Sequence, residues 1–284
     1  MNPQRIVVGY DGSDEARKAV DWAAAEAERT HTPLQIVHGY HVAWPSIYYD
    51  VTAELIEAAE RAGEQLVADA VTRVREHHNG IDVIGTAVHA SGAATLLDLT
   101  DTAASLLVVG SRGAGGVSNL LLGSVSQQVA THSRTPVVVV RGHADAVSGP
   151  VVVGVDGSAS GEVALRLAFE AATARGAEVV AIRAYVPPSP TLVLRDAAEA
   201  AERAALESSL SGWRERYPGV KVEALVTAGR TAKVLIGVSH TAQLVVVGSR
   251  GHGGFTGLLL GSVGQQLMHC AECPVLIAHA PAAP

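Results

Sequence analysis

One pattern of glycines occurs twice in this chain of 284 residues. Each copy follows an apolar run of strand length, at residues 105–110 and 244–248, and has the spacing Gly-x2-Gly-x9-Gly-Ser. Glycine lets the backbone turn with positive φ and expose its N–H groups, and the Gly-Ser pair opens a helical pattern whose first turn has unpaired donors. We therefore expect two phosphate-binding loops of backbone amides, although two purely structural turns are the alternative.

A second pattern indicates that a whole domain is duplicated. The sequence Val-Gly-x-Asp-Gly-Ser occurs at residues 8–13 and again at 153–158. Two copies of one fold are expected to follow from such a repeat. We place them at residues 1–143 and 150–284, joined by a short linker of small and polar residues.

Each copy alternates strand-like runs with helical patterns. The runs lie near residues 5–10, 34–40, 82–88, 105–110 and 136–141, and near 150–155, 178–185, 221–227, 243–248 and 274–278. Helical patterns in the first copy span residues 14–29, 52–76, 93–102 and 124–132. Several runs are continuous in β-branched residues, which is typical of parallel strands buried on both faces. This predicts an α/β fold with two tandem, doubly wound, five-stranded parallel sheets.

The position of a ligand follows from that fold. In a doubly wound sheet, ligands bind beyond the carboxyl ends of the strands, where the strand order reverses. Asp11 and Asp156 follow the first strand of each copy, so we expect them to face the glycine loops across a crevice. Each aspartate could bind a ribose hydroxyl, a base amine or hydrated Mg²⁺, or could serve only the turn before the next helix.

Composition excludes several classes of protein. The net charge of −7 and the lack of a Lys/Arg run argue against a nucleic-acid or acidic-membrane partner. Two cysteines fit a reducing cytoplasm, and no apolar stretch reaches membrane-spanning length. Cys270 and Cys273 form a C-x-x-C sequence, but at a helix end that leads into a strand, so we expect neither redox chemistry nor a metal site.

The chain resembles the universal stress protein family, specifically its tandem-domain, ATP-binding members. The resemblance depends on the two glycine patterns, the two Val-Gly-x-Asp-Gly-Ser openings, and the final strands that begin Thr135-Pro136-Val137 and Cys273-Pro274-Val275. It implies a cytoplasmic protein with strand order 3-2-1-4-5, a Rossmann-like sheet similar to that of the adenine nucleotide alpha hydrolases. It also implies ATP, with Mg, in each half, and a dimer. The final strands are expected to be sheet edges through which the halves associate.

The resemblance also assigns site residues. It places phosphate and ribose contacts on Gly110, Gly113, Gly123, Ser124 and Val125, and on Gly248, Gly251, Gly261, Ser262 and Val263. It places the base beside Asp11 and Asp156, with Gly9 and Gly154 allowing close approach. Gly39 and Ala184 stand where the family often has valine, and we expect these smaller residues to loosen the adenine wall. The remaining candidates complete the loops: Ser111, Arg112, Ala114, Gly115 and Gly116, then Ser249, Arg250, His252, Gly253, Gly254 and Gly264.

Within the loops, Arg112 and Arg250 could reach a phosphate or remain surface charges, and His252 could add a donor to the second site. The sequence has no Walker-type Gly-Lys-Ser/Thr, no Gly-x-Ser-x-Gly and no His-Glu-x-x-His motif. We therefore expect a protein that holds ATP as a regulator in stress response or growth control, acting on an unknown protein partner. The alternatives are a slow Mg-dependent ATPase that uses Asp11, an FAD-binding electron-transfer protein, and an interaction scaffold without a ligand.

Overall fold

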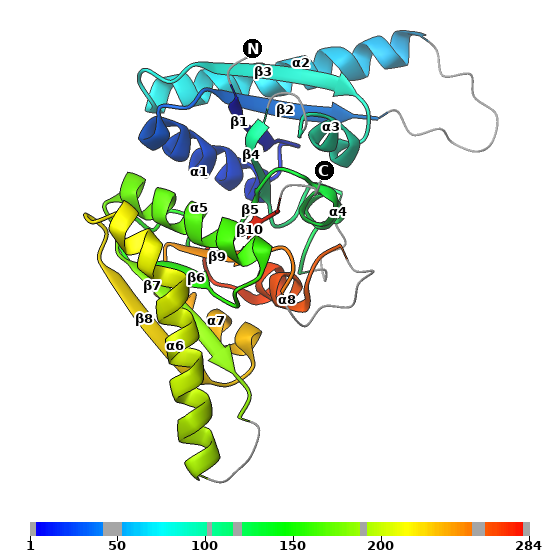
Figure 1. The fold of residues 1–284 in the computed structure, drawn as a ribbon. Helices are drawn as coiled ribbons and strands as arrows, with labels where there is room; N and C mark the ends of the chain where they lie inside the picture. The colour runs from blue at the N-terminus through cyan, green and yellow to red at the C-terminus, as the bar shows by residue number, and fades with distance from the viewer. Residues whose placement is uncertain are drawn as a thin grey trace, which may run out of the picture. The chain divides into compact units, whose positions relative to one another are not determined.

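The computed structural model describes residues 4–41, 53–100, 104–115, 121–187, 192–251 and 259–280. The chain divides into two compact units, Met1–Val140 and Arg141–Pro284. Each unit is a three-layer α/β sandwich (Figure 1). Among the described residues, no helix combines the length and apolarity needed to cross a bilayer.

The first unit has five strands and four helices in strict alternation. They are β1 (Arg5–Gly9), α1 (Asp14–Thr30), β2 (Leu34–Tyr40), α2 (Ala53–His77), β3 (Val83–His89), α3 (Gly92–Asp98), β4 (Ala104–Gly110), α4 (Ser124–His132) and β5 (Val137–Val140). All strand pairs in this unit are parallel, in the order β3-β2-β1-β4-β5. Helices α1 and α2 pack together on one face of the sheet, and α3 and α4 on the other.

The second unit repeats this arrangement. Its elements are β6 (Val151–Gly154), α5 (Ala159–Arg175), β7 (Val179–Tyr185), α6 (Leu192–Arg216), β8 (Val222–Ala228), α7 (Thr231–Val238), β9 (Leu244–Gly248), α8 (Ser262–Cys270) and β10 (Val275–Ala278). The strands are again parallel, in the order β8-β7-β6-β9-β10. The predicted fold class is therefore confirmed, with the strand order reversing between β1 and β4, and between β6 and β9.

The cores are built from aliphatic residues, as the composition requires. Val137–Val140 are wholly buried, which explains why β5 is a run of valine with no polar alternation. The one large aromatic residue with no exposed surface is Phe169 of α5, among the described residues. It packs against Trp213 of α6 and against Tyr217, the residue after that helix, with ring centroids 5.9 and 5.4 Å away.

Local signals explain where the helices begin and end. Ser13 and Ser158 cap α1 and α5, their hydroxyls accepting hydrogen bonds from Ala16 N and Gly161 N at 3.2 and 3.1 Å. Gly176 ends α5 in the left-handed conformation, with φ of 61°. The helix predicted at residues 93–102 was too long, because α3 ends at Asp98. The N–H of Ala104 then donates to Leu99 O at 3.1 Å.

The segment that joins the two copies is held by the second unit. A Cβ on Gly142 would lie 1.9 Å from Glu272 O, and Gly142 has φ of 57°, so glycine is required there. His143 donates its backbone N–H to Glu272 O at 2.9 Å, and its ring Nε2 lies 3.0 Å from Ala242 O. Gln243 Nε2 donates to Gly149 O at 2.6 Å. Both ends of the expected linker are therefore packed.

Candidate functional site

A cavity of about 560 Å³ lies at the carboxyl ends of β1, β2 and β4, and is called the first cavity below. It occupies the point where the strand order reverses, as expected for this fold. Ten of the expected residues line it: Gly9, Asp11, Gly39, Gly110, Arg112, Gly113, Gly115, Gly123, Ser124 and Val125. Gly116 lies outside the described residues.

Asp11 ties the two loops of the first cavity together. Its Oδ1 accepts the N–H of Ser13 at 3.0 Å, in the turn after β1. Its Oδ2 accepts the N–H of Ala114 at 2.8 Å, in the glycine loop after β4. The expected meeting of Asp11 with the glycine loop is thus present, and Ala114 takes part through its backbone.

Two glycines of the loop lie in close contact with neighbouring groups. A Cβ on Gly110 would lie 2.6 Å from the backbone oxygen of Glu15, so α1 could not approach β4 as it does. A Cβ on Gly113 would lie 2.4 Å from Asp11 Oδ2. Gly115 differs, because nothing lies within 4 Å of the position of its Cβ.

The start of α4 supplies backbone donors to the cavity. The N–H of Gly123 donates to Ser111 O at 2.7 Å. The first hydrogen bond of the helix runs from the N–H of Gln127 to Gly123 O, at 3.0 Å. The N–H groups of Ser124, Val125 and Ser126 therefore precede the first helical hydrogen bond, at the positive end of the helix dipole. Such a helix start binds anions readily.

Ser111 does not line the first cavity and instead has a structural role. It is buried, and its hydroxyl donates to Glu15 Oε2 at 3.2 Å. Burial raises the pKa of the Glu15 carboxyl, but the hydrogen bond and charge of Lys18, together with the Ser111 hydrogen bond and the charge of Arg112, outweigh burial, and the pKa lies below its ordinary value. Glu15 is therefore ionised at neutral pH, at the edge of the first cavity.

The second cavity, of about 790 Å³, lies at the equivalent place in the second unit. Ten expected residues line it: Gly154, Asp156, Ala184, Gly248, Arg250, Gly251, Gly261, Ser262, Val263 and Gly264. Ser249 is buried behind it, and His252, Gly253 and Gly254 lie outside the described residues.

Serine hydroxyls help to anchor the loop of the second cavity. Asp156 Oδ1 accepts the N–H and the hydroxyl of Ser158, at 2.9 and 2.7 Å. The Ser158 hydroxyl also lies 3.2 Å from the backbone oxygen of Arg250, to which Ser160 donates as well. A Cβ on Gly251 would lie 2.5 Å from Asp156 Oδ2, which matches the contact between Gly113 and Asp11.

The space that a side chain at Gly39 would take is occupied by the start of α3. A Cβ on Gly39 would lie 2.8 Å from Cα of Gly92 and 2.9 Å from Thr95 Oγ1. The missing side chain thus lets the start of α3 approach β2, and the backbone of α3 closes the wall. Ala184 lines the second cavity as expected.

Sequence reasoning missed several residues that line the cavities. Val37, His38 and Leu96 belong to the first, and Arg183 and Glu202 to the second. Arg183 follows Ile182 as His38 follows Val37, and Ile182 and Val37 are opposite Gly154 and Gly9 in the sheet. Aligning the two copies would have identified both positions, whereas no local motif marks them.

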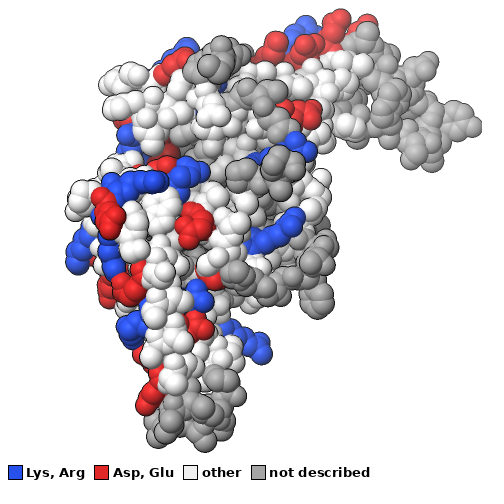
Figure 2. Space-filling view, in the orientation of Figure 1, with Lys and Arg blue, Asp and Glu red and all other residues white. Residues whose placement is uncertain are grey.

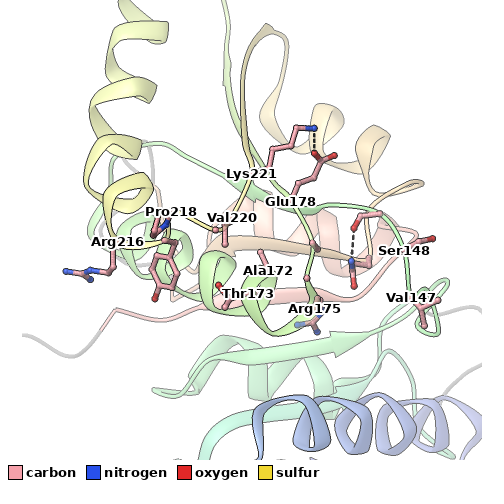
Figure 3. Close-up of a pocket in the computed structure, with 16 residues that line it drawn as sticks. Val147, Ser148, Ala172, Thr173, Arg175, Glu178, Arg216, Pro218, Val220 and Lys221 are labelled. Carbon is pink, nitrogen blue, oxygen red and sulfur yellow. Dashed lines mark hydrogen bonds and ion pairs between the residues drawn. The ribbon is translucent and has the colours of Figure 1, made fainter.

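A third cavity, of about 860 Å³, lies at the opposite end of the second sheet, before β6, β7 and β8 (Figure 3). Two of its basic side chains already have partners. Lys221 pairs with Glu178 at 2.7 Å, and the guanidinium carbon of Arg216 lies 5.2 Å from the ring centroid of Trp213. Figure 3 shows Arg216 extending away from the other labelled residues, so this cavity lacks the converging donors of the first two.

The remaining charged groups show no single-sign patch on the face drawn in Figure 2, where acidic and basic side chains alternate along α6. Arg203 pairs with Glu199 at 2.8 Å, and Arg214 with Glu207.

Among the described residues, no three His, Cys, Asp or Glu side chains are grouped to hold a metal ion. Burial raises the pKa of the Cys273 thiol to about 12, so it is a packing residue.

The comparisons with known proteins agree with this geometry. The model of the universal stress protein family matches residues 2–141 and 148–279. Universal stress proteins of Mycobacterium tuberculosis H37Rv and Mycolicibacterium smegmatis are each 38% identical, over 96% of this chain and 96% of the relative. The crystal structure of a universal stress protein from Archaeoglobus fulgidus DSM 4304 has a TM-score of 0.75 at 19% identity, covering 99% of this chain and 100% of that chain. The chain belongs to the universal stress protein family, with two such domains in tandem.

Proposed function

We propose that each unit binds one ATP and that the protein acts as a nucleotide-dependent regulator in stress response or growth control. The observation that carries this proposal is the same pairing in both units: an aspartate after the first strand meets a glycine loop, beside a helix start that offers backbone donors. Membership in the family supports the proposal, since the resemblance of these motifs implies ATP.

The described residues fit a nucleoside triphosphate. The triphosphate would lie against the backbone donors of Ser124 and Val125, or of Ser262 and Val263, where a negative charge is favoured by the helix dipole. The base would lie between the ends of β1 and β2, or of β6 and β7. Mg²⁺ would enter with the phosphates, to neutralise part of their charge, and Asp11 and Asp156 are carboxylates that lie against the loops.

The mechanism that we propose is a shift in population. Binding of ATP would order the glycine loops and so change the surface that the protein presents to a partner. The proposal includes a regulatory protein partner, a homodimer and a cytoplasmic location. Sedimentation of the protein with and without ATP tests self-association.

Calorimetric titration with ATP and Mg²⁺ tests the number of sites. The intact protein should bind two ATP per chain, and Ser124→Glu and Ser262→Glu should each bind one. Both serines are exposed in the first turn of a helix, where glutamate suits the dipole and should not impair folding, while its charge opposes phosphate.

Gln127→Glu and Gln265→Glu are the matched controls, because they add the same charge on the exposed side of the same helices, outside the lining of the cavities. These controls should keep two sites. Failure of the intact protein to bind ATP at millimolar concentration would refute the proposal. Release of flavin on denaturation would replace it with the electron-transfer alternative.

A further inference from the structure

The two cavities differ at one wall, although their loops match. Strands β2 and β7 contribute His38 and Arg183 at equivalent positions, one residue beyond the partners of Gly9 and Gly154. The neighbouring helices contribute Gly63 of α2 to the contact with His38, and Glu202 of α6 to the contact with Arg183. The same place in the fold is therefore filled by an imidazole over a glycine in one unit and by an ion pair in the other.

In the first unit, the histidine fills the space beside the helix. A Cβ on Gly63 would lie 3.1 Å from His38 Cδ2, so the imidazole packs against a helix residue without a side chain. His38 Nδ1 lies 2.7 Å from Tyr10 O, and because a carbonyl only accepts, Nδ1 carries the proton. A neutral ring in that tautomer has an acceptor at Nε2.

In the second unit, the ion pair is part of the cavity lining, and the cavity is larger at this side. Arg183 Nε donates to Glu202 Oε2, and the two side chains are 20% and 31% exposed. Ala198 and Glu202 of α6 join the lining of the second cavity, whereas no described residue of α2 lines the first. The volumes agree with this difference, at about 790 Å³ against about 560 Å³.

We propose that Arg183 and Glu202 make the second cavity bind guanine nucleotides more tightly than the ATP that it also accepts, while the first cavity prefers adenine. This inference rests on the proposed function, in which both cavities bind ATP with its base near β2 or β7. Guanine presents the N1–H and N2–H₂ donors beside the O6 acceptor, which a carboxylate and a guanidinium complement. An arginine paired to O6 and N7 is the commonest specific contact to guanine. Adenine presents N6–H₂, which the Nε2 acceptor of His38 suits and which guanine O6 would oppose.

The test uses the full chain with one cavity silenced at a time. Ser124→Glu leaves the second cavity, Ser262→Glu leaves the first, and calorimetry gives the dissociation constants of Mg-GTP and Mg-ATP for each. We expect the second cavity to bind GTP on the order of ten-fold more tightly than ATP, as one well-placed paired contact provides. We expect the first cavity to bind ATP more tightly than GTP.

Glu202→Gln in the Ser124→Glu background then tests the residue itself. It keeps the size of the side chain but removes the negative charge and one acceptor, so the preference for GTP should disappear. Glu199→Gln is the matched control, since Glu199 lies on the same helix, pairs with Arg203 and does not line the second cavity. This control should keep the preference.

The outcomes separate this inference from the proposed function. If both cavities bind ATP and show the same ratio of GTP to ATP affinity, the inference is overturned and the proposed function stands. A preference for GTP that Glu202→Gln leaves intact also overturns it. Binding of neither nucleotide by the intact protein refutes the proposed function itself.

Discussion

At the scale of single residues, the carboxylate of Asp11 already has partners in the protein. It accepts one N–H from the turn after β1 and one from the glycine loop, and Asp156 makes the matching contact to its own turn. A hydrogen bond to an ionised group is among the stronger ones in proteins. The aspartate therefore shapes the glycine loop as well as facing the cavity.

The glycines of the loop are not equivalent, and alanine substitution distinguishes them. Gly110→Ala would force a Cβ to within 2.6 Å of Glu15 O, which neither backbone can relieve without moving α1 away from β4. We expect a loss of about 1–3 kcal/mol in the free energy of unfolding, as for an overpacked core. Urea denaturation followed by far-UV circular dichroism measures it.

Gly115→Ala is the control for that substitution, because nothing lies within 4 Å of its Cβ position. Its stability should stay within about 0.5 kcal/mol of that of the intact protein. Equal destabilisation by the two substitutions would contradict the steric argument for Gly110.

The sequence allowed some of these residues to be predicted and not others. Gly110, Gly113 and Asp11 belong to a motif repeated in order along the chain, so their roles follow from spacing. Arg183 and Glu202 lie 19 positions apart on a strand and a helix, and their pairing exists only after the two elements pack. The closeness of Gly92 to Gly39 has the same origin, and no motif in the sequence indicates it.

At the scale of elements, the two N-cap serines make different numbers of hydrogen bonds. Ser13 accepts one hydrogen bond from Ala16 N. Ser158 accepts the equivalent bond, and its hydroxyl also contacts Asp156 Oδ1 and Arg250 O. Ser13→Ala should cost about 1 kcal/mol, a typical value for an N-cap, and Ser158→Ala should cost more, about 2 kcal/mol.

Urea denaturation of both serine variants measures the difference. Ser158→Thr retains the hydroxyl and should recover most of the stability, since threonine is also a good N-cap. Equal losses for Ser13→Ala and Ser158→Ala would show that the contacts of Ser158 to Asp156 and Arg250 contribute nothing.

The turn between α8 and β10 gives a prediction about pH. Burial raises the pKa of the Cys273 thiol to about 12, against about 8.5 for a free thiol in an unfolded chain. The thiol therefore stabilises the fold fully below about pH 8.5, and this contribution is lost as the pH rises from there toward 12. Cys273→Ala should reduce the fall in stability over that range.

Reactivity of the thiols provides the second measurement. Cys270 is exposed and Cys273 is buried, so iodoacetamide at pH 8 should modify Cys270 while Cys273 stays unmodified until the protein is denatured. Mass spectrometry of the peptides distinguishes them. Equal rates for the two cysteines in the native protein would refute the burial of Cys273.

The elements themselves were largely predictable, and their ends less so. Strands such as β5 are runs of valine with no polar residue, and helices such as α1 have a serine cap, so both can be recognised locally. The end of α3 was misplaced by four residues, from 102 to Asp98, since no glycine or proline marks it. The turn after it depends on the backbone bond from Ala104 to Leu99 instead.

At the scale of the whole molecule, the duplication sets the architecture, and each unit has its own five strands, core and cavity. Ligand binding should accordingly stabilise each unit through its own site. At an ATP concentration 100-fold above the dissociation constant, one bound ligand adds about 2.7 kcal/mol to stability. Hydrogen exchange of peptides from β4 and β9 should slow on addition of ATP, by up to about 100-fold where exchange requires unfolding.

Ser124→Glu separates the two effects. It should abolish the slowing in β4 and leave that in β9, and Ser262→Glu should do the reverse. Gln127→Glu serves as the control with both effects retained. Slowing of exchange in β4 by ATP in the Ser124→Glu variant would contradict the assignment of the first cavity.

The segment after Val140 has a consequence for how such a protein can be divided and inherited. Residues 142–149 resemble a spacer in sequence, yet their backbone contacts Glu272 and Gln243, and the His143 ring contacts Ala242, so they are part of the second unit. A domain boundary cut at residue 150 would remove residues 142–149 from the second unit, whereas a cut at residue 141 would keep them. If such domains are exchanged between genes, this segment is thus expected to be transferred together with the second domain.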